Sequence, residues 1–231
     1  MPPYAGTRAL IVAQFDDAAN AHNTLRRRAL ERLGCHVGTF DPGQSTWVER
    51  LTRADLTNRF ARSLDQNRPD FVLVIGDPGM PLDLLRELKV RRGTTLVNWY
   101  PGDMRGLTML RSAIGIYDHF FAAGTDLVAH LGAIEGARAS FLPVAADPSV
   151  YRPMRARGPF RANVVFAGAA TPRREQLLAE LVEFGLAVWG PGWRKTGLRD
   201  YCRGELPTTE DFVRAYAGAT VGINIHQSID P

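Results

Sequence analysis

The sequence has few of the residues that mark several common classes of protein. Cys35 and Cys202 are its two cysteines and lie far apart, so we expect neither a disulfide framework nor a zinc cluster. Lysine is as scarce, because Lys89 and Lys195 alone provide it among 28 basic residues. No apolar run approaches the ~20 residues that cross a bilayer. The N-terminus also lacks the charged-then-apolar order of a signal peptide, so we expect a cytoplasmic protein without a membrane span.

Three further absences exclude classes of function. No tract of five or more basic residues and no zinc-finger or RNA-module signature occurs, so a nucleic-acid partner is not expected. No Asp-x-Asp triplet occurs, so we predict no metal-bridged diphosphate and assign no metal ligand. The loop after the first expected strand, "VAQFDDAAN", contains no glycine. This argues strongly against a nicotinamide or flavin cofactor, which needs a G-x-G-x-x-G turn there.

The sequence does contain a regular alternation of strand and helix patterns within an ordinary globular composition of 45% hydrophobic and 23% charged residues. The strand patterns are "RALIVAQ", "CHVGTF", "DFVLVIG", "TTLVNW", "YDHFFAA" and "RASFLPV". The helical patterns cover Asp17–Leu33, Val48–Asn67, Pro81–Arg91, Met104–Ile114 and Thr125–Ile134. This alternation predicts a parallel sheet with helices on both faces, an N-terminal Rossmann-like domain over residues 1–144.

A proline-rich stretch, residues 145–161, follows without sustained periodicity, and we interpret it as a linker. The alternation then resumes over residues 162–231. The expected strands are Asn163–Ala167, Leu186–Trp189 and Thr220–Ile225, and the expected helices are Arg173–Phe184 and Thr209–Ala217. The fold class is therefore α/β, with two Rossmann-like domains of which the C-terminal one is apparently incomplete.

The strand "NVVFA" stops at Gly168, and Arg173 and Arg174 stand just inside the next expected helix. In open α/β sheets, ligands bind beyond the carboxyl ends of the strands, where loops lead into helix N-termini. Free N–H groups, the helix dipole and an arginine there favour an anion such as a diphosphate. The same residues also suit a plain strand-to-helix turn with solvated arginines.

Two other segments fall at the same expected sheet edge. In "VWGPGW", Gly190 turns the chain sharply, and Trp193 either stacks on a ligand or covers the core. In "VGINIHQS", Asn224 and His226 alternate outward at the end of a strand. A lone histidine is more often a structural residue than a catalytic one.

In order and spacing, these segments resemble the CgeB-like, spore-maturation-type glycosyltransferases of the two-Rossmann GT-B architecture. The resemblance covers most of the chain and is strongest from "YDHFFAAGTDLVAHLGAIEGARASFLPVAADPSVYRP" through "VVFAGAATPRREQLLAEL", "VWGPGW" and "YAGATVGINIH". It implies a nucleotide-diphosphate sugar as donor substrate, with no further cofactor. By the resemblance, three motif pairs bind the donor, at the diphosphate, the nucleotide and the sugar respectively: Gly168 and Arg173, Gly190 and Trp193, Asn224 and His226.

The resemblance also implies that an unknown acceptor enters from the N-terminal domain. Asp16 and His22, in the loop after the first strand, are the candidate catalytic bases, since a base must lie within hydrogen-bond reach of the acceptor. Asn23, and Trp99 and Asp103 of "NWYPGD", are the candidate acceptor-side residues. Capping of the first helix explains Asp16, Asp17 and Asn23 at least as well.

The sequence departs from the family's pattern in having no glutamate after Glu210. We therefore expect a truncated form of the enzyme or one half of a split glycosyltransferase. A second polypeptide or self-association would then complete the C-terminal domain. The alternative function is a non-catalytic nucleotide-binding module.

Overall fold

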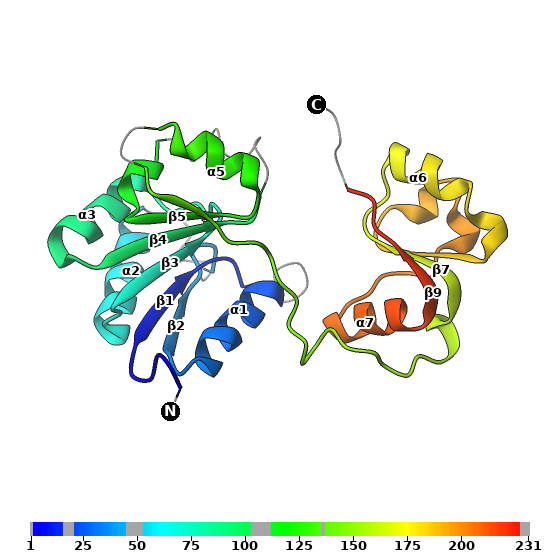
Figure 1. The fold of residues 1–231 in the computed structure, drawn as a ribbon, viewed down its shortest axis with the longest axis horizontal. Coiled ribbons are helices and arrows are strands. Elements are labelled where there is room, and N and C mark those ends of the chain that lie inside the picture. The colour runs from blue at the N-terminus through cyan, green and yellow to red at the C-terminus, as the bar shows by residue number, and fades with distance from the viewer. Residues whose placement is uncertain (1, 16–20, 45–52, 103–111, 135–136, 227–231) are drawn as a thin grey trace. The chain divides into compact units, whose positions relative to one another are not determined.

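The computed structural model of the chain describes residues 2–15, 21–44, 53–102, 112–134 and 137–226. Its internal contacts divide the chain into two compact units, Met1–Ala145 and Ala146–Pro231 (Figure 1). Each unit contains its own parallel sheet and is described by itself.

The sheet of the first unit has six strands in the order β2-β1-β3-β4-β5-β6, and neighbouring strands are parallel. The strands are β1 (Arg8–Val12), β2 (His36–Phe40), β3 (Phe71–Ile75), β4 (Thr95–Tyr100), β5 (His119–Ala122) and β6 (Ala139–Phe141). The strand order reverses between β1 and β3. In open parallel sheets this is the point at which a ligand crevice opens beyond the carboxyl ends.

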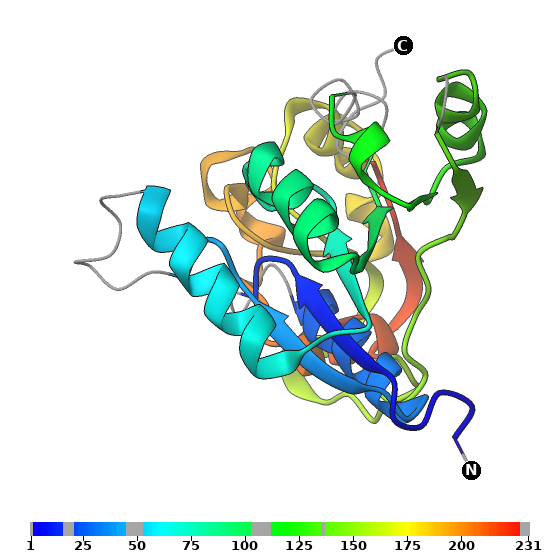
Figure 2. The same ribbon diagram turned by 90° about the vertical axis from the view of Figure 1, so that its left-hand side faces the viewer.

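In the described part of this unit, four helices cover the sheet: α1 (Ala21–Arg32), α2 (Arg53–Asn67), α3 (Leu82–Arg92) and α5 (Thr125–Gly132). Leu85 of α3 and Leu127 of α5 join Phe60 of α2 in the larger core cluster, so these three helices share one face, on which α2 and α3 lie together in Figure 2. Leu30 of α1 packs instead with Ile11 of β1 on the opposite face. Because β1 lies between helices on both faces, its apolar residues from position 9 onward are buried.

The second unit has a three-stranded parallel sheet in the order β8-β7-β9. Its strands are β7 (Ala162–Ala167), β8 (Leu186–Trp189) and β9 (Ala219–Ile223), and its helices are α6 (Pro172–Ala179) and α7 (Thr209–Ala217). Leu178 of α6 packs with Phe166 on one face, and Ala215 of α7 packs with Val165 on the other. The order reverses between β7 and β9, so the loops after these two strands flank the expected crevice.

The α/β architecture with two Rossmann-like sheets is as predicted, and β8 and α7 have the predicted bounds. One helix differs. The pattern predicted a helix over Arg173–Phe184, whereas α6 ends at Ala179 and a separate 3-10 turn covers Val182–Phe184. The break lies at Leu181, whose φ of -101° and ψ of 2° fall outside the helical region, and Gly185, with φ of 77°, then leads the chain from the turn into β8.

Two other expected helices begin in residues that lie outside the described ranges. The starts predicted at Asp17 and Val48 fall there, and α1 and α2 are described from Ala21 and Arg53. Most of the helix predicted over Met104–Ile114 also lies outside the described ranges.

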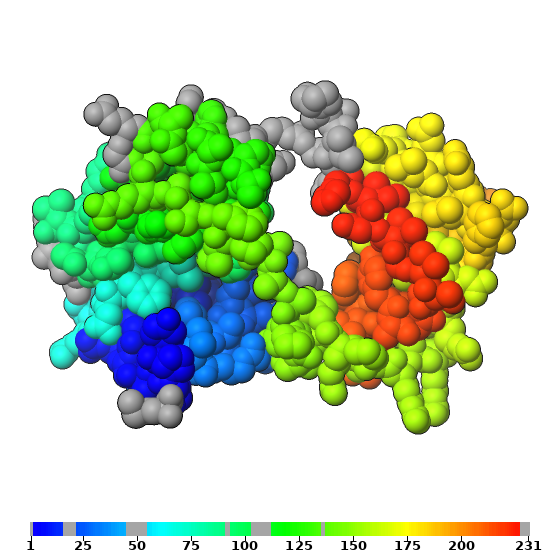
Figure 3. Space-filling model, viewed as in Figure 1, coloured from blue at the N-terminus to red at the C-terminus, as the bar shows by residue number. Residues whose placement is uncertain are grey.

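Strand β9 forms one edge of the second sheet. Atoms of this strand lie on the surface that is visible in Figure 3 (red). Val221, in the middle of the strand, is 46% exposed although it is β-branched and apolar. An open strand edge with an apolar side chain is a surface suited to pairing with another strand.

Candidate functional site

The turns after β7 and β8 run side by side at the carboxyl edge of the second sheet. The amide of Gly168 donates to the carbonyl of Trp189 at 2.9 Å, and the amide of Ala170 donates to the carbonyl of Pro191 at 2.9 Å. Gly190 has φ of 125°, and a Cβ at this position would lie 2.4 Å from the carbonyl oxygen of Gly168. Gly190 is therefore required by both its backbone conformation and the close approach of the two turns.

Trp193 follows these turns and is fully buried. Its indole Nε1 donates to the carbonyl of Gly168 at 2.7 Å, and its ring meets Phe166 edge-on at a centroid distance of 5.9 Å. Of the two roles that the sequence left open for Trp193, the structure shows the core role. The ring has no exposed face on which a nucleotide could stack, contrary to the nucleotide contact that the resemblance implied for Trp193.

The peptide groups between β7 and α6 differ in what they can offer a ligand. The N–H and C=O of Gly168 are both used within the protein. Thr171 caps α6, since its hydroxyl accepts from the amide of Arg174 at 3.3 Å, and Pro172 occupies the first helical turn. The amides of Ala169 and Thr171 have no hydrogen-bond partner among the described residues. These two amides and the α6 terminus are the local donors for an anion.

Arg174 joins the loops that follow β7 and β9. Its Nη1 donates to the carbonyl of Ala169 at 2.8 Å, and its Nη2 and Nε donate to the carbonyl of Ile225 at 2.8 and 3.1 Å. The guanidinium also lies 5.2 Å from the ring centroid of Phe166. Both acceptor carbonyls are neutral, so the positive charge of Arg174 contributes an attractive potential to this sheet edge.

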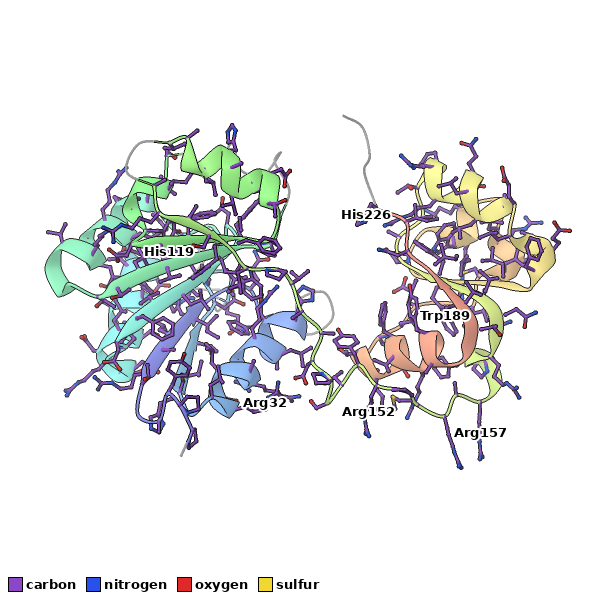
Figure 4. All side chains as sticks on the ribbon, in the orientation of Figure 1. Arg32, His119, Arg152, Arg157, Trp189 and His226 are labelled. Carbon is purple, nitrogen blue, oxygen red and sulfur yellow. The ribbon has the colours of Figure 1, made fainter. Side chains whose placement is uncertain are left out.

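The sequence did not separate Arg174 from its neighbour Arg173, which was the predicted diphosphate ligand. Arg173 lies exposed in the first turn of α6. After β9, Asn224 and His226 are exposed while Ile225 is half-buried, which is the predicted alternation (Figure 4 labels His226). The helix start and the end of β9 thus lie at one sheet edge, connected by Arg174.

In the first unit, three predicted or newly found residues meet at the carboxyl end of β1. Asn23 is 5% exposed, and its Nδ2 donates to the carbonyl of Gln14 at 2.8 Å. Its Oδ1 accepts from Nη1 of Arg26 at 2.6 Å. The Arg26 guanidinium carbon lies 4.4 Å from the ring centroid of Trp99, whose Nε1 donates to the carbonyl of Leu142 at 3.0 Å. The structure therefore brings Asn23 and Trp99 together through Arg26.

Of the two candidate bases, His22 lies partly exposed on the first turn of α1. Partial burial and, to a lesser extent, the charge of Arg26 lower the pKa of His22 below its ordinary value of 6.5. The imidazole is therefore neutral at pH 7, the form in which histidine accepts a proton. The other candidate base, Asp16, and the acceptor-side candidate Asp103 lie outside the described residues.

A buried polar group lies on the other face of the first sheet and was not predicted. Asn98 is fully buried, its Nδ2 donates to the carbonyl of Gly76 at 3.0 Å, and its Oδ1 has no partner among the described residues. Burial raises the pKa of Tyr117 to about 12, with the nearby side chain of Asn98 opposing the shift and the charge of Asp77 adding to it. The signal in the sequence was an asparagine inside the apolar run "TLVNWY".

Within the described residues, no three His, Cys, Asp or Glu side chains are grouped to hold a metal ion. None of the helices in the described part of the chain combines the length and the apolar character needed to cross a bilayer.

Neither a protein-family model nor a curated protein matches this sequence. Among solved structures, the fold is similar to that of a sucrose-phosphate synthase from Thermosynechococcus elongatus, with a TM-score of 0.65. The match covers 93% of this chain and 74% of that chain, at 12% sequence identity. At this identity the likeness establishes the fold, which is the GT-B type with two Rossmann-like sheets. It does not distinguish the CgeB-like branch from others that share this architecture.

Proposed function

We propose that this chain is a glycosyltransferase-like protein that binds a nucleotide-diphosphate sugar and transfers the sugar to an acceptor. The assignment to the CgeB-like branch is part of the proposal and rests on the order of the motifs quoted above. The observation that carries the donor site is the joining of the β7 and β9 loops by Arg174 at the reversal point of the second sheet.

The donor diphosphate is proposed to lie at the start of α6. The amides of Ala169 and Thr171 and the helix dipole would donate to its oxygens, and the exposed Arg173 would add a charge-assisted hydrogen bond. Gly168 and Gly190 would support this site by packing their backbones together, not by binding the ligand themselves. Asn224 and His226 are proposed to face the sugar or ribose from the end of β9.

This arrangement would favour departure of the nucleoside diphosphate by stabilising the charge that develops on it. Fixed amides, a helix terminus and a nearby guanidinium stabilise such a charge without reorganising during the reaction. The acceptor is proposed to bind near Asn23 and Trp99, with His22 or Asp16 receiving its hydroxyl proton. The neutral state of His22 supports the base assignment, because a protonated imidazole cannot accept that proton.

The second candidate is a nucleotide-binding module without transfer activity, or one half of a split transferase. The exposed edge of β9 favours it, because another polypeptide or a second copy can add a strand there. Both candidates predict nucleotide binding, and they differ in whether the chain alone hydrolyses or transfers the donor sugar.

The test is isothermal titration of the purified chain with uridine, guanosine and thymidine diphosphates, using the wild type and Arg173→Gln. We expect one nucleotide to bind and the variant to bind it about tenfold more weakly, as for one charged hydrogen bond. Arg157→Gln is the matched control, because Arg157 is exposed in the same unit and points away from the β7 and β9 ends (Figure 4).

Absence of binding by all three nucleotides would contradict the donor site. If nucleotide binding weakens equally in the Arg173 and Arg157 variants, the effect is one of net charge and not of a specific contact by Arg173. A transfer or hydrolysis assay with a diphosphate sugar of the nucleotide that binds then separates the two candidates.

A further inference from the structure

We propose that Arg26 forms an anion-binding site in the first unit, which recognises a carboxylate or phosphate group on the acceptor. That the anion belongs to the acceptor rests on the proposed function, whereas the binding of an anion by Arg26 does not.

Arg26 has hydrogen-bonding capacity that the described residues do not use. A guanidinium carries five N–H donors, and toward the described residues Arg26 uses one of them, to Asn23. No carboxylate of the described residues pairs with it. By contrast, Arg59 lies 3.8 Å from Asp55 and Arg8 lies 3.2 Å from Asp70. A half-buried guanidinium without a carboxylate partner is a site that an external anion can satisfy.

Arg26 is held in place on both sides. The Trp99 ring lies beneath the guanidinium, and the indole is itself anchored to the carbonyl of Leu142. Asn23 holds one edge and is in turn anchored to the carbonyl of Gln14. A planar fork fixed in this way keeps its remaining donors in one orientation, which suits the two oxygens of a carboxylate or phosphate.

The position of Arg26 in the sheet architecture also suits a ligand site. Gln14 follows β1, Trp99 belongs to β4, and Arg26 is on the helix that follows β1, so the group lies toward the carboxyl ends of the strands. This is the edge at which parallel sheets bind ligands. Burial lowers the pKa of Arg26, but an arginine stays charged at neutral pH, so the site is positive. The partly exposed His22, one helical turn earlier, gives the same surface a neutral polar group.

The experiment is isothermal titration of the full chain at low salt with glucose 6-phosphate, glucuronate and glucose. We expect at least one of the two anions to bind, and glucose to bind at least about tenfold more weakly. A preference between the anions identifies the recognised group. In Arg26→Gln we expect the affinity for the anion to fall about tenfold to a hundredfold, the loss of one or two charge-assisted hydrogen bonds.

Two controls define the site. Arg28→Gln removes the same charge from an exposed position on the same helix and is expected to change the affinity less than about twofold. Arg173→Gln tests whether the anion binds instead at the candidate donor site, and it is expected to leave the affinity unchanged. If Arg26→Gln fails to fold, Arg26→Lys keeps the charge without the planar fork and is expected to weaken binding to a smaller extent.

The proposal is overturned if neither anion binds, if glucose binds as tightly as the anions, or if Arg26→Gln or its folded substitute Arg26→Lys binds like the wild type. It is also overturned if Arg28→Gln or Arg173→Gln causes the same loss. Failure here with intact nucleotide binding removes the anion site and leaves the donor site in place. Loss of nucleotide binding with intact anion binding does the reverse.

Discussion

The indole of Trp193 donates a hydrogen bond to the carbonyl oxygen of Gly168 over 2.7 Å, from a fully buried position. This bond fixes the turn after β7 from within the core of the second unit. Trp193 therefore supports the backbone of the candidate donor site from the core side.

Replacing Trp193 with phenylalanine keeps an aromatic ring but leaves the Gly168 carbonyl without its donor. A buried acceptor without a partner costs about 1–3 kcal/mol, so we expect the free energy of unfolding to fall by at least that amount. Urea denaturation of the wild type and variant measures it. Phe184→Leu, at a side chain that is 54% exposed, is the control and is expected to change stability by less than about 0.5 kcal/mol.

Replacing Gly190 with alanine introduces a side chain at φ of 125° and 2.4 Å from the carbonyl oxygen of Gly168. Backbone strain and a contact that only backbone movement can relieve act together, so we expect a loss of about 3 kcal/mol or more. Thermal unfolding followed by circular dichroism provides the measurement. In Gly132→Ala, where nothing lies near the added methyl group in α5, unchanged or slightly raised stability is expected. Equal effects in the two variants would contradict the role assigned to Gly190.

The pKa of His22 is expected to lie below 6.5 and to depend partly on Arg26. In Arg26→Gln the neighbouring positive charge is lost, so the pKa of His22 should rise. The rise should remain incomplete because burial, the larger cause, is retained. Proton NMR of the imidazole resonances against pH measures this, with His22→Asn used to assign the signal. An unchanged pKa in Arg26→Gln would show that the two side chains are not close in solution.

Tyr117 predicts a loss of stability in alkaline solution. Its pKa is raised to about 12 in the folded protein, from an ordinary value of 10.0. Between these values the unfolded chain has lost the phenolic proton and the folded chain retains it. The contribution of Tyr117 to the free energy of unfolding is thus fully present below pH 10. It falls as the pH rises toward 12, by about 2–3 kcal/mol in total. Urea denaturation at pH 9 and pH 11 should show a smaller decrease in Tyr117→Phe than in the wild type. Equal decreases would contradict the shift.

The sequence predicted those parts of the fold that have local start and stop signals. Helix α7 begins after Thr208, whose hydroxyl accepts from the amide of Asp211 at 3.1 Å, and it ends before Gly218. Strand β8 lies between Gly185 and Gly190, which both have positive φ. Such signals act within a few residues, so they are readable without the tertiary structure.

The site was less predictable because it depends on contacts between distant segments. Arg173 and Arg174 are chemically identical, and the sequence does not show that Arg174 contacts the carbonyls of Ala169 and Ile225. The pattern "GPGW" likewise does not state whether the indole points outward or toward Gly168. Arg26 carried no motif at all, and its importance follows from its contacts with Asn23 and Trp99.

The grip of Arg174 on two carbonyls has a thermodynamic consequence. Ala169 precedes α6 and Ile225 follows β9, so docking of β9 and formation of the proposed diphosphate site would be coupled through Arg174. A ligand bound at the proposed diphosphate site would protect the amides of β9 from hydrogen exchange, although it need not touch that strand. Conversely, any change that destabilises the docking of β9 would weaken ligand binding by the same free energy, since linkage between two sites is reciprocal.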